Sequence, residues 1–144
     1  MHNDHPKVYL FVHLIWTVYE RTPLLSRPVR KWLFTALQKD AAEKGINLVA
    51  VNGVEDHVHC LVQLLPAQNI TQVINSIRTS SSLWLNENKL LDSAFAWEEG
   101  YAAYSVSPSS VRQVIDYIGR QEEVHKTKTL ESEMEVFKNA KTSI

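Results

Sequence analysis

Two strand-like segments separated by only two residues constrain the fold of this chain most strongly. Residues 46–54 and 57–65 are rich in apolar and β-branched side chains, and Glu55-Asp56 is all that separates them. Strands joined by so short a connection pair side by side in opposite directions. The sequence therefore predicts an antiparallel hairpin in the middle of the chain.

The apolar periodicity on either side of the hairpin predicts alternating strands and helices. The expected elements are a strand at 8–17, a helix from Ser26-Pro28 to Gly45, a helix from Asn69, short strands at 95–97 and 102–106, a helix opened by Ser107-Pro108, and a weak helix at 131–140. The serine run at 80–82 obscures where the second helix ends. This order is typical of an α+β fold with a ferredoxin-like, RRM-like antiparallel sheet packed with helices.

Composition bounds the architecture and the location of the protein. A chain of 144 residues with 44% apolar content is expected to form one domain over 1–144, with a tail after about residue 126 that is mobile or swapped. The single cysteine, Cys60, excludes an intramolecular disulfide and fits a reducing compartment. The longest apolar run, 8–18, is too short to cross a bilayer, so a cytoplasmic protein without a membrane partner is expected.

The charge distribution argues against a generic polycation. The net charge is −1, yet residues 1–44 carry seven Lys and Arg against four Asp and Glu. A local basic surface around Arg21, Arg27, Arg30 and Lys31 is one interpretation of this bias. A solvated helix face explains each of these side chains equally well.

The segment His57-Val58-His59 offers two imidazoles on one face of the second hairpin strand. Side chains alternate along a strand, so His57 and His59 point the same way, about 7 Å apart, and can converge on one ion. Cys60 faces the opposite way. A histidine pair on a strand is by itself more often a pair of hydrogen-bonded or exposed residues than a metal site.

A tyrosine and a glutamine four positions apart mark the third helix. Tyr117 and Gln121 would share a face of a continuous helix and would present a phenol and a carboxamide together. Both lie on the flank of the apolar stripe, where a tyrosine usually packs with a wet hydroxyl and a glutamine is usually solvated. The helix pattern alone leaves both interpretations open.

Four segments together resemble a known family. In order, they are VHLIWTVYER, VEDHVHCLV, FAWEEGYAAYSVS and DYIGRQEEVHK. They resemble the single-tyrosine HUH transposases of insertion sequences and the relatives that act on repetitive extragenic palindromes. The resemblance runs from about Tyr9 to His125. Members commonly have two adjacent histidines shortly after the glutamine, whereas here Val124 precedes His125.

The resemblance implies a role for particular residues. It makes His57, His59 and Gln121 the metal ligands and Tyr117 the nucleophile. Asp56 is a candidate for orienting a ligand histidine, although a turn explains it equally well, and His125 is a candidate for a supporting or phosphate contact. The candidates for DNA contact are Arg21, Arg30, Lys31, Arg112 and Arg120.

The resemblance also implies a reaction and its partners. The expected enzyme cleaves and rejoins single-stranded DNA at hairpin-bearing ends through a 5′-phosphotyrosine, uses Mg²⁺ or Mn²⁺, and acts as a homodimer associated with the nucleoid. Whether each tyrosine helix serves its own histidines or those of the partner stays open. The alternatives are a non-catalytic module that binds single-stranded nucleic acid, a structural zinc protein, and a domesticated relative that processes chromosomal palindromes.

Overall fold

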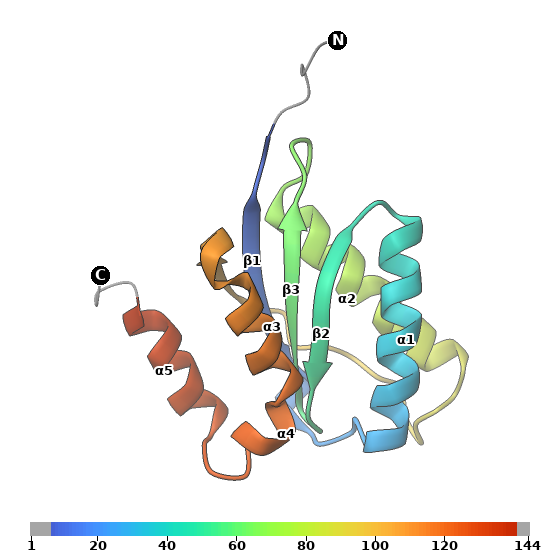
Figure 1. The fold of residues 1–144 in the computed structure, drawn as a ribbon. Coiled ribbons are helices and arrows are strands. Elements are labelled where there is room, and N and C mark those ends of the chain that lie inside the picture. Colours follow the sequence, from blue (N-terminus) through green and yellow to red (C-terminus); the bar gives the residue numbers. More distant parts are fainter. Residues whose placement is uncertain (1–6, 141–144) are drawn as a thin grey trace.

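A four-stranded antiparallel sheet in the order β2-β3-β1-β4 forms the centre of the protein (Figure 1). The computed structural model describes residues 7–140. The strands are β1 (Leu10–Thr17), β2 (Asn47–Gly53), β3 (His57–Leu64) and β4 (Ala102–Val106). The helices are α1 (Arg27–Glu43), α2 (Ile70–Glu87), α3 (Val111–Gly119), α4 (Gln121–Val124) and α5 (Leu130–Ala140), with short 3-10 turns η1 (Tyr19–Arg21) and η2 (Pro108–Ser110). The predicted α+β, ferredoxin-like class is confirmed.

The main hydrophobic core lies between the sheet and the two helices α1 and α2. Alternate residues of β1 and β3 supply one side of it, among them Leu14, Trp16, Val58 and Cys60. The predicted helix signals hold: Pro28 stands in the first turn of α1, and the Asn69 side chain accepts a hydrogen bond from the backbone N–H of Gln72 at the start of α2. Burial of this face leaves the other face of the sheet for α3, α4 and α5.

The predicted hairpin is formed by β2 and β3, and its turn is tight. Gly53 pairs with Val58, and a Cβ added at Gly53 would overlap the backbone carbonyl oxygen of His57. The backbone N–H of Val54 donates to that same carbonyl over 3.1 Å. Glycine is therefore required at position 53 because the two backbones approach so closely there.

One predicted strand was wrong, and the end of the second helix, which the sequence left open, lies at Glu87. Residues 95–97 form a single bridge from Trp97 to Val18 rather than a strand, because β4 takes the open edge of β1 while Trp97 turns inward to pack edge-on against Trp16 at 5.7 Å. The serine run does not end α2. Ser81 is buried, donates to the carbonyl of Ile77 and accepts from Trp97 Nε1, so its hydroxyl is satisfied inside the helix.

The continuous third helix predicted from the sequence is broken between Tyr117 and Gln121. α3 ends at Gly119, Arg120 has φ −106° and ψ 25°, and α4 begins at Gln121. The side-chain amide of Asn52, on β2, donates to the carbonyl of Ile118 over 2.9 Å. In a continuous helix that carbonyl would accept from the backbone four residues later, so Asn52 stabilises the interruption.

The helices α3, α4 and α5 cover the sheet face that carries the two histidines of β3. α5 runs beside α3 (Figure 1), and its Phe137 ring lies 4.9 Å from the ring of His13 and 5.4 Å from that of Tyr117. Leu130 at the start of α5 is buried. Among residues 7–140, no helix combines the length and the apolar character that a membrane crossing requires.

Candidate active site

The two histidines of β3 are fully buried beneath α3, α4 and α5. His57 is 1% exposed and His59 is 0% exposed. Alternation along β3 places Val58 and Cys60 in the core on the opposite face. The tight turn at Gly53 fixes where β3 begins, and therefore which face of the sheet the histidines occupy.

Asp56 orients the imidazole of His57 through a hydrogen bond to the ring nitrogen that faces away from His125. The Nδ1 of His57 donates to Asp56 Oδ1 over 2.8 Å, and Arg21 Nε donates to Asp56 Oδ2 over 3.1 Å. The hydrogen bond with His57, opposed by burial and assisted by Arg21, holds the pKa of Asp56 below its usual value. A carboxylate on Nδ1 leaves the Nε2 atom of His57 as the lone-pair atom facing inward.

His13 of β1 supports His59, a role that the sequence did not reveal. Its Nε2 lies 2.8 Å from His59 Nδ1, and His13 is only 1% exposed. Burial, and then the neighbouring His59, lower the pKa of His13 to about 3, so its ring is neutral. Only the pairing of β1 with β3 brings the two rings together, and no local pattern around His13 encodes that pairing.

Tyr117 and Gln121 meet at a third residue, Glu133 of α5. The Tyr117 hydroxyl donates to Glu133 Oε2, and Gln121 Nε2 donates to the same oxygen over 3.0 Å. The Tyr117 ring lies 6.2 Å from the ring of His59. Gln121 is 0% exposed because α5 closes over the flank, so of the two interpretations that the helix pattern left open, the solvated glutamine is excluded.

Glu133 is the second functional candidate that sequence reasoning missed. Glu133 is 2% exposed, and its Oε1 lies 3.3 Å from His59 Nε2 and 3.0 Å from His125 Nε2. Burial, opposed by the field of His57, raises its pKa to about 7. Glu133 is three positions after Leu130 and four before Phe137, so helical spacing places it beside the apolar face of α5 and places Glu135 away from that face; this spacing is the signal that could have singled it out.

His125 follows α4 and turns into the cluster. Its Nδ1 donates to the carbonyl of Lys128 over 3.0 Å, and its Nε2 lies 3.1 Å from the Nε2 of His57. Burial and the neighbouring His57 lower its pKa. From the sequence, His125 could be either a supporting residue of the site or an exposed surface residue. In the structure its imidazole contacts His57 and Glu133.

These side chains fit a divalent cation. His57, His59, His125 and Glu133 each present a ligand atom, and all four atoms lie within 4.8 Å of one another. His59 Nε2 and Gln121 Oε1 are buried and have no hydrogen-bond partner among the described residues. Buried acceptors of this kind are rarely left without a partner, and imidazole with carboxylate or amide oxygen is a donor set that binds divalent metals.

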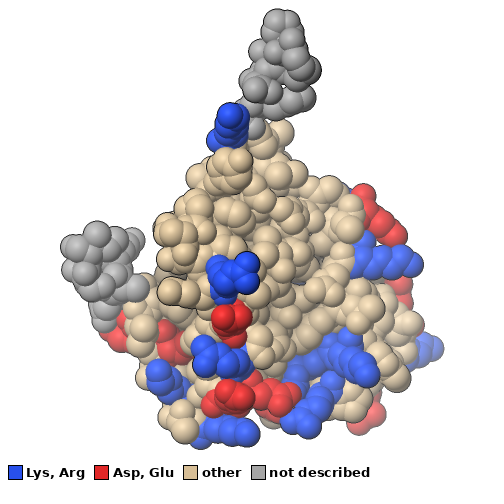
Figure 2. All heavy atoms as spheres, viewed as in Figure 1, with Lys and Arg blue, Asp and Glu red and all other residues tan. Residues whose placement is uncertain are grey.

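The basic residues proposed for DNA contact differ in their exposure and in whether they form ion pairs with acidic side chains. Arg21 pairs with Asp56 and Glu131, and the nearly buried Arg30 pairs with Glu122 and Glu55. Side chains of both signs gather at the end of the molecule where α4 and the start of α1 lie (Figure 2). Exposed side chains are found for Lys31, Arg112 and Arg120. This end of the protein therefore presents mixed charge rather than one basic patch.

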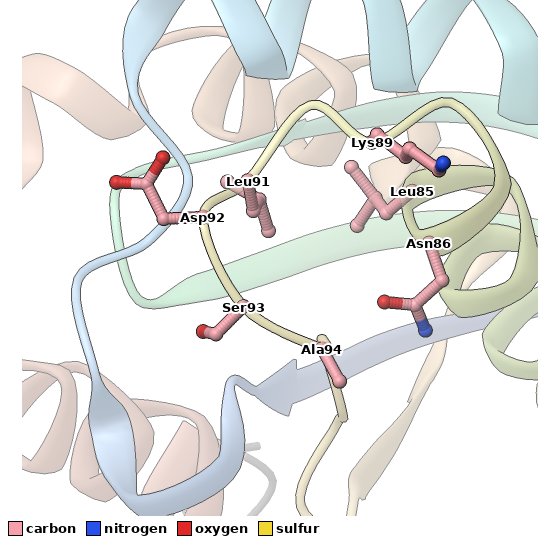
Figure 3. A pocket seen from close by; sticks show the side chains of 7 residues that line it. All are labelled: Leu85, Asn86, Lys89, Leu91, Asp92, Ser93 and Ala94. Atoms are coloured by element: carbon pink, nitrogen blue, oxygen red, sulfur yellow. The ribbon is translucent and has the colours of Figure 1, made fainter.

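A separate hollow lies at the far end of α2. It measures about 390 Å³ and lies between α2 and the loop that follows (Figure 3). The lining residues are Leu85, Asn86, Lys89, Leu91, Asp92, Ser93 and Ala94. None of them is a histidine, cysteine or tyrosine, so this hollow lacks the chemistry present beneath α5.

Comparison with known proteins places the chain in a family. The model of the transposase IS200-like family matches residues 7–121, which span the histidine pair, the tyrosine and the glutamine. The chain belongs to the IS200-like transposases. The predicted membership of the single-tyrosine HUH transposases is thereby confirmed. Within this transposase, His125 and Glu133 lie beyond the matched residues.

Individual relatives agree with this assignment. The ISDra2 transposase TnpA of Deinococcus radiodurans is 27% identical over 114 residues, which cover 76% of this transposase and 81% of the relative. A crystal structure described as a transposase from Deinococcus radiodurans R1 is 26% identical, covers 84% of this chain and 98% of that one, and superposes with a TM-score of 0.65. A REP-associated tyrosine transposase bound to a REP hairpin shares the fold, with a TM-score of 0.60 over 86% of this chain and 74% of that one at 15% identity.

Proposed function

We propose that this transposase cleaves and rejoins single-stranded DNA at hairpin-bearing ends through a covalent 5′-phosphotyrosine on Tyr117. One observation carries the proposal. The Tyr117 hydroxyl and the imidazoles of His57 and His59 share a single buried cluster within one chain, linked by Glu133. If Tyr117 served only to pack the helix, nothing would require it to lie beside buried acceptor atoms that have no partner among the described residues.

The proposed metal ligands are His57, His59 and Gln121. His59 Nε2 and Gln121 Oε1, which are buried and have no hydrogen-bond partner in the described part of the chain, support this assignment. A bound divalent cation would polarise a non-bridging oxygen of the scissile phosphate and neutralise charge that develops there. Two imidazoles are softer ligands than Mg²⁺ usually takes, so Mn²⁺ is favoured over Mg²⁺.

In the proposed cleavage, the oxygen of Tyr117 attacks the phosphorus and the bond to the 3′-oxygen breaks. The tyrosine then carries the 5′-phosphate, and the other strand ends in a free 3′-hydroxyl. The ester energy is kept in the adduct, so a later 3′-hydroxyl can attack it and rejoin strands. The Glu133 carboxylate holds the Tyr117 hydroxyl in one direction, and Asp56 holds the His57 ring.

Substrate and assembly are parts of the same proposal. The shared fold with a REP-associated transposase that is bound to a REP hairpin supports a hairpin in the DNA. A homodimer, a single domain over 1–144 and a cytoplasmic, nucleoid-associated location also stay predictions. A mobile-element transposase and a domesticated relative would share this chemistry, and the DNA flanking the gene separates them.

Covalent trapping tests the proposed reaction. The protein is incubated with hairpin-ended single-stranded DNA and Mn²⁺, denatured, and separated by size. We expect a protein–DNA adduct that disappears in Tyr117→Phe and persists in Tyr104→Phe, a matched control on β4 of the same sheet. DNA binding without an adduct would favour the non-catalytic binding module, and an adduct that survives Tyr117→Phe would refute the proposed nucleophile.

A further inference from the structure

We propose that His125 and Glu133 bind the same divalent cation as His57 and His59 in the DNA-free protein. This inference rests on the proposed function, because it extends the metal site of that reaction. It adds two ligands from the part of the chain beyond residues 7–121, where the family model ends. The proposed ligand atoms are Nε2 of the three histidines and Oε1 of Glu133.

The outer hydrogen bonds of two histidines fix which ring nitrogen faces the cluster. The Nδ1 of His57 meets a carboxylate oxygen of Asp56, and the Nδ1 of His125 meets the carbonyl oxygen of Lys128. Both partners only accept, so both Nδ1 atoms carry the proton. When both rings are neutral, the two Nε2 atoms are therefore lone-pair acceptors, and they face each other at 3.1 Å.

His59 and Glu133 add two further acceptors to the same space. His59 Nδ1 is engaged with His13, and its buried Nε2 has no hydrogen-bond partner within residues 7–140 and lies 3.3 Å from Glu133 Oε1. That carboxylate oxygen lies 3.0 Å from His125 Nε2. Three imidazole nitrogens and one carboxylate oxygen therefore converge with all their ligand atoms within 4.8 Å.

Such a cluster is unfavourable without positive charge at its centre. Each buried acceptor without a donor costs about 1–3 kcal/mol, and acceptors facing one another repel. A divalent cation bound by all four atoms removes both costs. Three imidazoles and a carboxylate are ligands that transition-metal ions such as Mn²⁺, Co²⁺ and Zn²⁺ take more readily than Mg²⁺ does.

The two oxygens of Glu133 divide the contacts between the cation and the nucleophile. Oε1 faces the imidazoles, whereas Oε2 accepts from Tyr117 and Gln121. One carboxylate of α5 therefore joins the metal site to the tyrosine hydroxyl. Gln121 holds Glu133 through its amide nitrogen, and its other amide atom, Oε1, stays available as the third ligand proposed for the reaction.

Metal affinity of the DNA-free protein tests the inference without any reaction. Mn²⁺ is titrated calorimetrically into the full chain and into the variants Glu133→Gln, His125→Asn and Glu135→Gln, the last altering an exposed carboxylate of the same helix. We expect at least about tenfold weaker binding for the first two, since even residues that only support a ligand cost that much, and no change for Glu135→Gln. Unchanged affinity in Glu133→Gln, or no binding of Mn²⁺ to the wild-type chain, would overturn the inference.

A second measurement uses the wild-type chain and is immune to misfolding of a variant. Pulsed electron paramagnetic resonance of bound Mn²⁺, with and without ¹⁵N-labelled histidine, counts the imidazoles on the ion. Three support the inference, and two overturn it. If Tyr117 forms an adduct but Mn²⁺ affinity does not depend on Glu133, the proposed function stands and this inference fails. If Mn²⁺ is bound by His125 and Glu133 but no adduct forms, this inference stands and the proposed function fails.

Discussion

The hydroxyl of Tyr117 donates a hydrogen bond to the buried carboxylate of Glu133, sixteen positions further along the same chain. Through Glu133 the tyrosine reaches His59 and His125 of its own protomer. The meeting of the phenol with the paired imidazoles therefore needs no second subunit in this arrangement.

We predict that two inactive variants do not complement each other. Because Tyr117 and His59 of one chain lie together, with ring centres 6.2 Å apart, a mixture of Tyr117→Phe and His59→Ala should form no covalent DNA adduct. Gel separation of the denatured mixture measures this. Wild-type protein mixed with Tyr117→Phe serves as the positive control. Recovery of adduct in the mixture of the two variants would show that the tyrosine helix acts on the histidines of the partner.

Asn52→Ala should weaken both the fold and the adduct reaction. The lost hydrogen bond to the carbonyl of Ile118 costs about 1 kcal/mol in the free energy of unfolding, measured by urea denaturation. The larger effect is expected on the rate of adduct formation, because the end of α3 that carries Tyr117 is no longer fixed. Asn47→Ala, at the other end of β2, removes an exposed amide contact with Gln63 and should leave that rate unchanged. Equal rates in the two variants would contradict this role for Asn52.

Gly53→Ala should destabilise the protein by about 1–3 kcal/mol, because the added Cβ overlaps the backbone oxygen of His57. The β2–β3 turn must open to relieve the overlap, which shifts the start of β3, so metal binding should weaken as well. Thermal unfolding and Mn²⁺ titration measure the two effects. Gly100→Ala is the control, since a Cβ there would meet no atom within 4 Å. A stable Gly53→Ala protein with unchanged Mn²⁺ affinity would refute the tight turn.

Glu133 should make the metal-free protein less stable as the pH rises. Burial raises the pKa of this carboxyl from an ordinary 4.5 to about 7, so the folded state binds its proton more tightly than the unfolded state does. Stability attributable to this group is fully present below pH 4.5 and is lost as the pH rises through about 7, by on the order of 3 kcal/mol. Urea denaturation in a chelator should show the wild type losing stability relative to Glu133→Gln across this window. Parallel pH profiles for the two proteins would refute the shift.

Much of the fold follows from local sequence signals. Ser26 precedes α1 and Pro28 stands in its first turn, Asn69 caps α2, and three residues connect β2 to β3. Capping, turn geometry and alternation act between residues a few positions apart, so one sequence is enough to read them. The family was equally visible, because the motif residues stand at fixed separations along the chain.

The composition of the site could not be read in the same way. The break at Arg120 depends on Asn52 of a distant strand, and His13 becomes a partner of His59 only when β1 pairs with β3. Helical spacing puts Glu133 beside the apolar face of α5, but only the docking of that helix over the sheet makes Glu133 a partner of His59. The sequence by itself determined most of the strands and helices and the face of β3 on which the histidine pair lies, since these follow from short-range periodicity. Tertiary structure alone decided which buried groups surround them, because burial and long-range hydrogen bonds exist only once remote segments pack together.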